Sequence, residues 1–171
     1  PNRYPIQTEL HTFNEELIAD AINFELSRNG QILFVHNRVQ NIYEVQRLIQ
    51  RLVPDARIQV GHGQLEPEKL EQLLVDFINQ DFDILIATTI IESGIDIPNV
   101  NTVIVYEADK FGLAQLYQIK GRVGRGAKSS YAYLTYLPGA HMTPEAEKRL
   151  QTIAEFTELG AGFKIAMRDL E

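Results

Sequence analysis

Short apolar runs and amphipathic segments alternate along most of this chain, and this alternation limits the folds available to it. Residues 32–35 (Ile-Leu-Phe-Val) form a continuous apolar run, typical of a strand that is buried on both faces. Residues 42–52 follow with apolar side chains at the helical spacing. Strands that alternate with helices are joined by right-handed crossovers and lie parallel. We therefore predict an α/β fold, a mostly parallel sheet with helices on both faces.

Local signals give the expected bounds of each element. Asn14 is a suitable N-cap for a helix whose first turn is acidic, and Gly30 is a suitable stop after it. Pro67 stands at the first position of a later helix. Strands are expected at 6–13, 32–35, 57–60, 83–88, 102–106 and 131–136, and helices at 15–29, 42–52, 67–79, 113–123 and 144–159.

Composition sets further limits on function. The 171 residues are 44% hydrophobic and 23% charged, as in a globular domain with a buried core. The net charge of -7 does not by itself favour nucleic acid as a partner. The absence of cysteine excludes disulfides and thiolate metal sites, and it is compatible with the cytoplasm. No apolar run approaches the ~20 residues of a membrane span, so no membrane partner is expected.

A pair of arginines near residue 120 is the strongest candidate for anion binding. Arg122 and Arg125 are three residues apart at the end of a predicted helix, and guanidinium groups suit bidentate contact with phosphate. Gln118 and Gly121 precede them, and the glycine permits close approach of a ligand. The alternative is a solvated basic helix end. A phosphate-binding loop is not expected at this place, because Ala127 stands where that motif needs lysine.

A second candidate segment follows the strand expected at 83–88. Thr88 and Thr89 offer hydroxyl groups at the carboxyl end of that strand, where ligands of parallel sheets bind. Gly94 allows unusual backbone geometry, and Asp96 could accept a hydrogen bond from a ribose hydroxyl. The alternative is a polar loop in which Asp96 caps its own turn.

Two further loops follow the ends of other expected strands. His36 and Asn37 come after one of them, and Gly61 and His62 after another, so the topology would bring them to the same edge. The remaining histidines have no companions at metal-ligand spacing. No metal site is therefore expected in this chain.

Taken in order, these segments resemble motifs IV, V and VI of the second motor domain of superfamily 2 helicases and translocases. The resemblance is stronger to the bacterial transcription-repair coupling factors, with the RecG-type translocases as a related family. It covers nearly the whole chain and depends on residues 88–98 (TTIIESGIDIP), 111–118 (FGLAQLYQ) and 121–125 (GRVGR).

The resemblance implies a RecA-like domain that binds ATP with Mg²⁺ jointly with a first motor domain. That first domain would supply the phosphate-binding lysine and the Asp-Glu pair, and this chain has neither motif. The chain is therefore not expected to hydrolyse ATP alone. The implied roles are arginine fingers for Arg122 and Arg125, a γ-phosphate sensor for Gln118, and nucleotide contacts for Gly94, Asp96 and Gly121.

The resemblance also implies double-stranded DNA as a partner, with RNA polymerase and excision-repair proteins bound through other domains. A motor that moves along any sequence needs contacts to the DNA backbone, which carry no sequence information. The residues implied in such contacts are His36, Asn37, Gly61, His62, Thr88 and Thr89.

The end of the chain does not continue the strand-helix rhythm. We expect a motor domain over residues 1–137 and a helical extension over 138–171, which resembles an incomplete translocation motif. Arg149 is the candidate residue for coupling this extension to the motor, and the alternative is a surface ion pair with Glu145 one helical turn earlier. Because the chain starts with Pro1 and ends within expected structure, we expect a fragment of a longer protein.

Two other functions remain open from the sequence alone. One is a RecG-type translocase that reverses replication forks, and the other is a non-enzymatic domain that binds a nucleotide or a protein. The net charge does not exclude DNA as a partner, because residues 110–130 contain five basic residues and no acidic one. We expect this stretch to form a cationic edge that faces the first motor domain and ATP, with only weak DNA binding by the chain alone.

Overall fold

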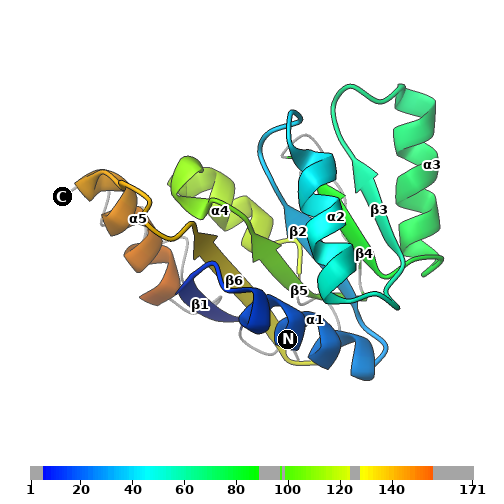
Figure 1. Ribbon diagram of the computed structural model, residues 1–171, viewed down its shortest axis with the longest axis horizontal. Coiled ribbons are helices and arrows are strands. Elements are labelled where there is room, and N and C mark those ends of the chain that lie inside the picture. Colours follow the sequence, from blue (N-terminus) through cyan, green and yellow to red (C-terminus); the bar gives the residue numbers. More distant parts are fainter. Residues whose placement is uncertain (1–5, 89–96, 98, 124–127, 156–171) are drawn as a thin grey trace.

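Six parallel strands form a single sheet in the order β1-β6-β5-β2-β4-β3 (Figure 1). The computed structural model describes residues 6–88, 97, 99–123 and 128–155. The elements are β1 (Ile6–Thr12), α1 (Glu15–Ser27), β2 (Gln31–Val35), α2 (Ile42–Leu52), β3 (Ile58–Gly61), α3 (Pro67–Ile78), β4 (Ile84–Ala87), β5 (Val100–Val105), the 3₁₀ helix η2 (Ala108–Lys110), α4 (Leu113–Lys120), β6 (Ser130–Tyr136) and α5 (Pro144–Glu155).

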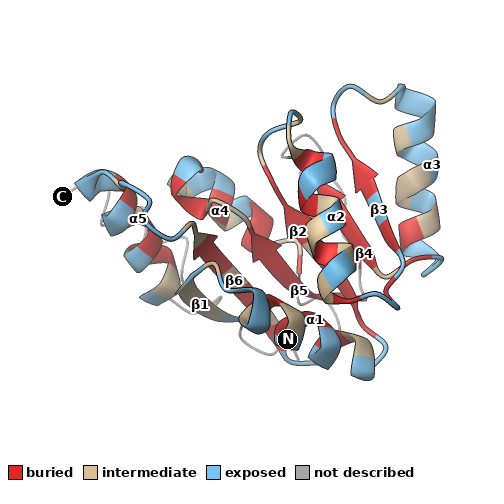
Figure 2. Ribbon diagram, viewed as in Figure 1, coloured by how far each residue is buried: buried red, intermediate tan, exposed pale blue. Residues whose placement is uncertain are grey.

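Helices cover both faces of the sheet, as the alternating pattern predicts. Successive residues of β4 serve opposite faces: Ile84 and Ile86 pack in the core under α1 and α2, and Leu85 packs in the core on the side of α3, α4 and α5. The strands β4 and β5 are buried along their whole lengths (Figure 2). The predicted fold class is therefore confirmed.

The end of α1 differs from the prediction in one detail. Asn14 caps the start as expected, since its side chain accepts a hydrogen bond from the Leu17 N–H at 3.1 Å. At the other end the left-handed residue is Asn29, with φ of 62°, and not Gly30. The structure requires glycine at position 30 for space, because the carboxylate of Glu25 occupies the place of a Cβ.

The start of the predicted extension is packed against the sheet. Leu150 and Ile153 of α5 are buried in the same core as residues of β5 and α4, and α5 also contacts β1. Residues 156–171, which include the rest of the predicted extension, lie outside the described residues. No helix in the described part of the chain is long and apolar enough to cross a membrane.

Candidate functional site at the carboxyl edge of the sheet

The topology brings the predicted loops together at one edge of the sheet. Thr88 follows β4 and donates its N–H to the Gly61 carbonyl of β3 at 3.2 Å. His36 follows β2 and donates its N–H to the Ala87 carbonyl of β4 at 2.8 Å. The ends of β2, β3 and β4 are therefore level, and His36, His62 and Thr88 lie directly after them at one edge.

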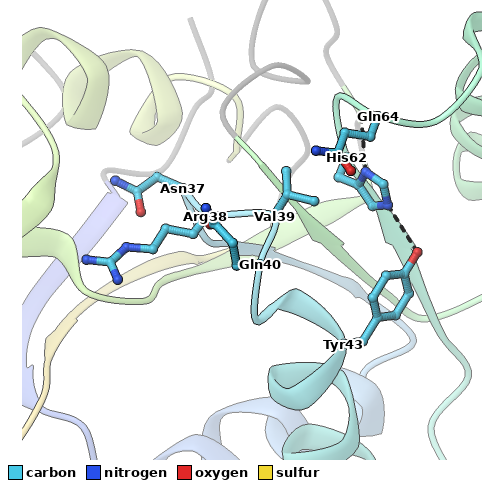
Figure 3. Close-up of a pocket in the computed structure, with 7 residues that line it drawn as sticks. All are labelled: Asn37, Arg38, Val39, Gln40, Tyr43, His62 and Gln64. Carbon is cyan, nitrogen blue, oxygen red and sulfur yellow. Dashed lines mark hydrogen bonds between the residues drawn. The ribbon is translucent and has the colours of Figure 1, made fainter.

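A cavity of about 520 Å³ opens at this edge, between the loops that follow β2 and β3 (Figure 3). Among the residues that line it, one is a cation, Arg38, and no carboxylate is present. This is notable in a chain with 23 acidic residues. The lining residues are Asn37, Arg38, Val39, Gln40, Tyr43, His62 and Gln64.

His36 lies beneath this site and not at its surface. Its side chain is fully buried, with Nε2 2.7 Å from the Asn41 Oδ1 and the ring edge-on to Tyr106 at 4.9 Å. Burial, with a smaller effect from the charge of Glu107, raises the pKa of Tyr106, so this phenol stays neutral beside the histidine. The predicted direct contact of His36 with DNA does not fit this burial, and His36 supports the loop instead.

Three buried polar atoms at the same edge have no hydrogen-bond partner among the described residues. They are Nδ1 of His36, Oδ1 of Asn37 and Oγ1 of Thr88. Buried polar atoms in proteins are nearly always paired, so hydrogen bonding at this edge is incomplete within the described residues. The unpaired atom is an acceptor in Asn37 and a hydroxyl in Thr88, and the predicted DNA contacts of both residues stay predictions.

His62 is held between two partners. Its side chain is 6% exposed, its Nδ1 accepts the N–H of Gln64 at 3.1 Å, and its Nε2 lies 3.1 Å from the Tyr43 hydroxyl. Tyr43 belongs to none of the motifs that predict the site. The contact joins residues 19 positions apart, one on α2 and one directly after β3, and no linear pattern marks it.

The arginine segment lies apart from this cavity. Gln118 is exposed on α4, and Gly121 ends that helix with its N–H bonded to the Tyr117 carbonyl at 3.0 Å. Arg122 is half-buried in the turn that follows the helix, since α4 ends three residues earlier than predicted. Arg122 is therefore not on the helix, and the prediction that it shares a helix face with Arg125 is wrong.

Four predicted site residues cannot be placed. Thr89, Gly94, Asp96 and Arg125 lie outside the described residues, and their roles stay predictions. Within the described ranges, no group of three or more histidine and carboxylate side chains could hold a metal ion.

The basic stretch 110–130 does not form one cationic edge, contrary to the expectation. Lys120 is buried at 3% exposure. Lys128 lies at the opposite edge of the sheet, where its Nζ donates to the Arg28 carbonyl at 2.5 Å. Lys110 is 3.7 Å from the Asp109 carboxylate. Sequence proximity placed these charges together, but α4 and the following turn separate them.

Arg149 connects α5 to the segment after β5. Its Nη2 donates to the Asp109 carbonyl at 3.4 Å, and Asp109 belongs to η2. The ion pairs found among the described residues do not include the alternative pair of Arg149 with Glu145. The contact joins α5 to the segment that follows β5, and the coupling role of Arg149 stays a prediction.

Comparisons with known proteins define the class first. Residues 13–127 match the family described as Helicase conserved C-terminal domain, which covers more than half of the chain, so the chain belongs to this family. It is 54% identical over 169 residues to a transcription-repair-coupling factor of Staphylococcus haemolyticus, and 53% identical over the same length to that of Staphylococcus aureus strain USA300. These alignments cover 99% of this chain and 14% of each relative.

Solved structures agree with this assignment. RecG bound to a three-way DNA junction matches with a TM-score of 0.83 and 33% identity, over 99% of this chain and 22% of that one. The second helicase domain of Mss116p, a DEAD-box protein, matches with a TM-score of 0.64 at 20% identity over 77% of this chain, which shows the shared fold alone. The resemblance to coupling factors with RecG-type relatives is confirmed.

Proposed function

We propose that this chain is the second motor domain of an ATP-dependent translocase on double-stranded DNA that displaces stalled RNA polymerase and couples transcription to excision repair. The observation that carries the proposal is 54% identity to a transcription-repair-coupling factor along 99% of the chain. The cavity after β2 and β3 supports the DNA-binding part, because it presents amides, a hydroxyl and a guanidinium without a carboxylate. Such a protein works in the cytoplasm.

ATP would bind between this domain and a first motor domain, which would also hold Mg²⁺. The donor groups on this chain fit a nucleotide phosphate: Gln118 is exposed on α4, and the Arg122 guanidinium lies directly after that helix. Arg125 with Arg122 would present positive charge to the terminal phosphate as arginine fingers. Gly94, Asp96 and Gly121 would contact the nucleotide. Arginine fingers accelerate other nucleotidases by ~10³–10⁵.

Asn37 and Arg38 at the cavity, and Thr88 with Thr89, would contact the backbone of the DNA. Contacts of this kind position a protein without reading sequence, as a motor requires. Arg149 would transmit movement between the core and the extension through the Asp109 carbonyl. Opening and closing of the two motor domains in each ATP cycle would then move the protein along the duplex.

The arginine-finger role is tested by Arg125→Ala in the full-length protein. We expect DNA-stimulated ATP hydrolysis to fall by at least ~10³-fold, with little change in the affinity for a fluorescent ATP analogue. Arg51→Ala is the matched control, because Arg51 is an exposed arginine on the outer side of α2 and is not part of the site. Near-normal turnover by the Arg125→Ala protein would refute the assignment.

A RecG-type function is the second candidate, and the TM-score of 0.83 to RecG on a three-way DNA junction favours it. The two functions predict different substrates for the full-length protein. A coupling factor releases stalled RNA polymerase from DNA and leaves fork structures largely unchanged. Efficient reversal of model forks without polymerase release would replace the first proposal with the second.

A further inference from the structure

We propose that Tyr43 is a DNA-binding residue, whose hydroxyl donates a hydrogen bond to a phosphate oxygen of the DNA backbone. In this arrangement His62 is a positioning residue that holds the hydroxyl and does not itself contact the DNA. The inference rests on the proposed function, and it adds a contact that the sequence motifs do not include.

The hydrogen bonds of His62 fix its tautomer. The backbone N–H of Gln64 is always a donor, and it points at Nδ1 of His62 from 3.1 Å. Nδ1 must therefore be the acceptor and carry no proton. The ring proton then lies on Nε2, which is 3.1 Å from the Tyr43 hydroxyl oxygen (Figure 3).

This tautomer determines what the Tyr43 hydroxyl can do. Because Nε2–H of His62 donates to it, the phenol oxygen is used as an acceptor on that side. Its own proton is not needed for the histidine and remains available for another acceptor. His62 thus leaves the Tyr43 hydroxyl as a hydrogen-bond donor toward the cavity. Such a donor suits an anionic oxygen, and it does not suit a cation or a second donor.

The position of Tyr43 allows that contact. Tyr43 is 46% exposed and lines the cavity, whereas His62 is 6% exposed behind it. The rings are perpendicular, with centroids 5.8 Å apart, so the pair is packed as well as hydrogen-bonded. Tyr43 also lies in the first turn of α2, a helix of 11 residues whose positive end adds to the attraction for an anion.

The surroundings favour a phosphodiester over a base or a carboxylate-bearing partner. Arg38 extends from the loop on the other side of the cavity, and Asn37 lies beside it (Figure 3). Donors and one cation on a wall without carboxylates match a strand of backbone phosphates passing over the ends of β2 and β3. Tyr43 would orient a phosphate through its hydrogen bond, and Arg38 would supply positive charge to the phosphates.

The test is the affinity of the full-length protein for a short fluorescein-labelled duplex of arbitrary sequence, measured by anisotropy over a range of salt concentrations. Tyr43→Phe should weaken binding by roughly 10-fold at every salt concentration, because the hydrogen bond of an uncharged donor is lost while the charge of the protein is unchanged. Arg38→Gln should reduce the slope of log affinity against log salt by about 1. Tyr131→Phe, the same change at the opposite edge of the sheet, should alter neither quantity.

The outcomes separate the inference from the proposed function. If the wild-type protein binds DNA and the Tyr43→Phe protein binds it with the same affinity, only the role of Tyr43 is overturned. Absence of DNA binding by the wild-type protein would overturn both. An unchanged melting temperature of Tyr43→Phe is expected, since the residue is exposed, and it excludes a folding effect.

A double-mutant cycle tests the role of His62. If His62 acts through the hydroxyl, His62→Ala should weaken DNA binding in the wild-type background and have little further effect in Tyr43→Phe. An equal loss in both backgrounds would mean that His62 contacts the DNA directly, and would overturn its positioning role. Nitrogen chemical shifts of the His62 ring in the folded protein provide a second readout, with the Nε2–H tautomer expected and the Nδ1–H tautomer contradicting the inference.

Discussion

Two groups of buried polar side chains, one at each edge of the sheet, are paired in different ways. At the amino edge, the fully buried Glu25 carboxylate accepts two hydrogen bonds from Arg28, at 2.7 and 2.8 Å, and a third from the Thr102 hydroxyl. At the carboxyl edge, atoms of Asn37 and Thr88 are buried and have no partner among the described residues. The Glu25 network is complete without a ligand, whereas the Asn37 and Thr88 atoms are unpaired in the described part of the chain; at the amino edge Asn101, near the start of β5, also has an unpaired amide oxygen.

The pairing at the amino edge has a structural purpose. Arg28 also donates to the Ser129 carbonyl at 2.7 Å, so it joins the end of α1 to the segment that leads into β6, 101 residues away. Its hydrogen bond with Glu25 raises the pKa of Arg28, and burial opposes that effect only in part. Phe24 and Tyr131 place their rings 5.0 and 5.5 Å from the guanidinium. Charge at this edge thus stabilises the fold, and charge at the other edge is available for function.

Removal of the carboxylate at the amino edge should have the largest effect on stability. Glu25→Ala leaves the Arg28 guanidinium without its main partner in a largely buried place, so we expect a loss of about 3–5 kcal/mol of unfolding free energy. Urea denaturation measures this loss, and Asp20→Ala, an exposed acid on the same helix, should change stability by less than ~0.5 kcal/mol. Similar losses in both variants would mean that the network is not important for folding.

A methyl group at Gly30 should disturb the same network from the backbone side. Because the Glu25 carboxylate fills the space of a Cβ, Gly30→Ala must displace that carboxylate, at a cost of about 1–3 kcal/mol. Gly121→Ala is the control for stability, since its Cβ would meet the nearest carbonyl oxygens at 3.5 Å, an ordinary contact. Equal thermal stability of Gly30→Ala and the wild type would show that the Glu25 carboxylate can move to another position without loss of stability.

The comparison also shows what the sequence could predict. Hydrophobic periodicity placed the six strands and the helices, because each side chain on a buried face must meet an apolar neighbour. It also brought His36, His62 and Thr88 to one edge, since parallel strands end together. Those successes rest on patterns within one segment or on the order of segments.

The failures come from contacts between distant segments. Glu25 lies three residues after Ile22 on the buried face of α1, and only Arg28 and Thr102 explain how a charge is accommodated there. Lys120 and Lys128 are close in sequence to Arg122 but not part of one surface. Tyr43 becomes a candidate only when α2 and β3 place it beside His62. No linear motif contains this information.

A pair of matched substitutions compares the two edges most directly, with the smallest expected effects. Thr102→Val removes a hydroxyl that donates to the Glu25 carboxylate, so it should lower the unfolding free energy by about 1–3 kcal/mol and leave DNA affinity unchanged. Thr88→Val removes a hydroxyl that is buried without a partner, so it should leave stability unchanged or raise it by up to about 1 kcal/mol.

The same Thr88→Val change should weaken DNA binding by the full-length protein several-fold, because under the proposed function bound DNA would draw this hydroxyl into a hydrogen bond with a backbone phosphate. Urea denaturation and anisotropy titrations of both variants measure the two quantities side by side. If the Thr88→Val protein loses stability and keeps its DNA affinity, Thr88 has a structural partner. The two edges would then differ only in composition, and the unpaired atoms would no longer mark the binding site.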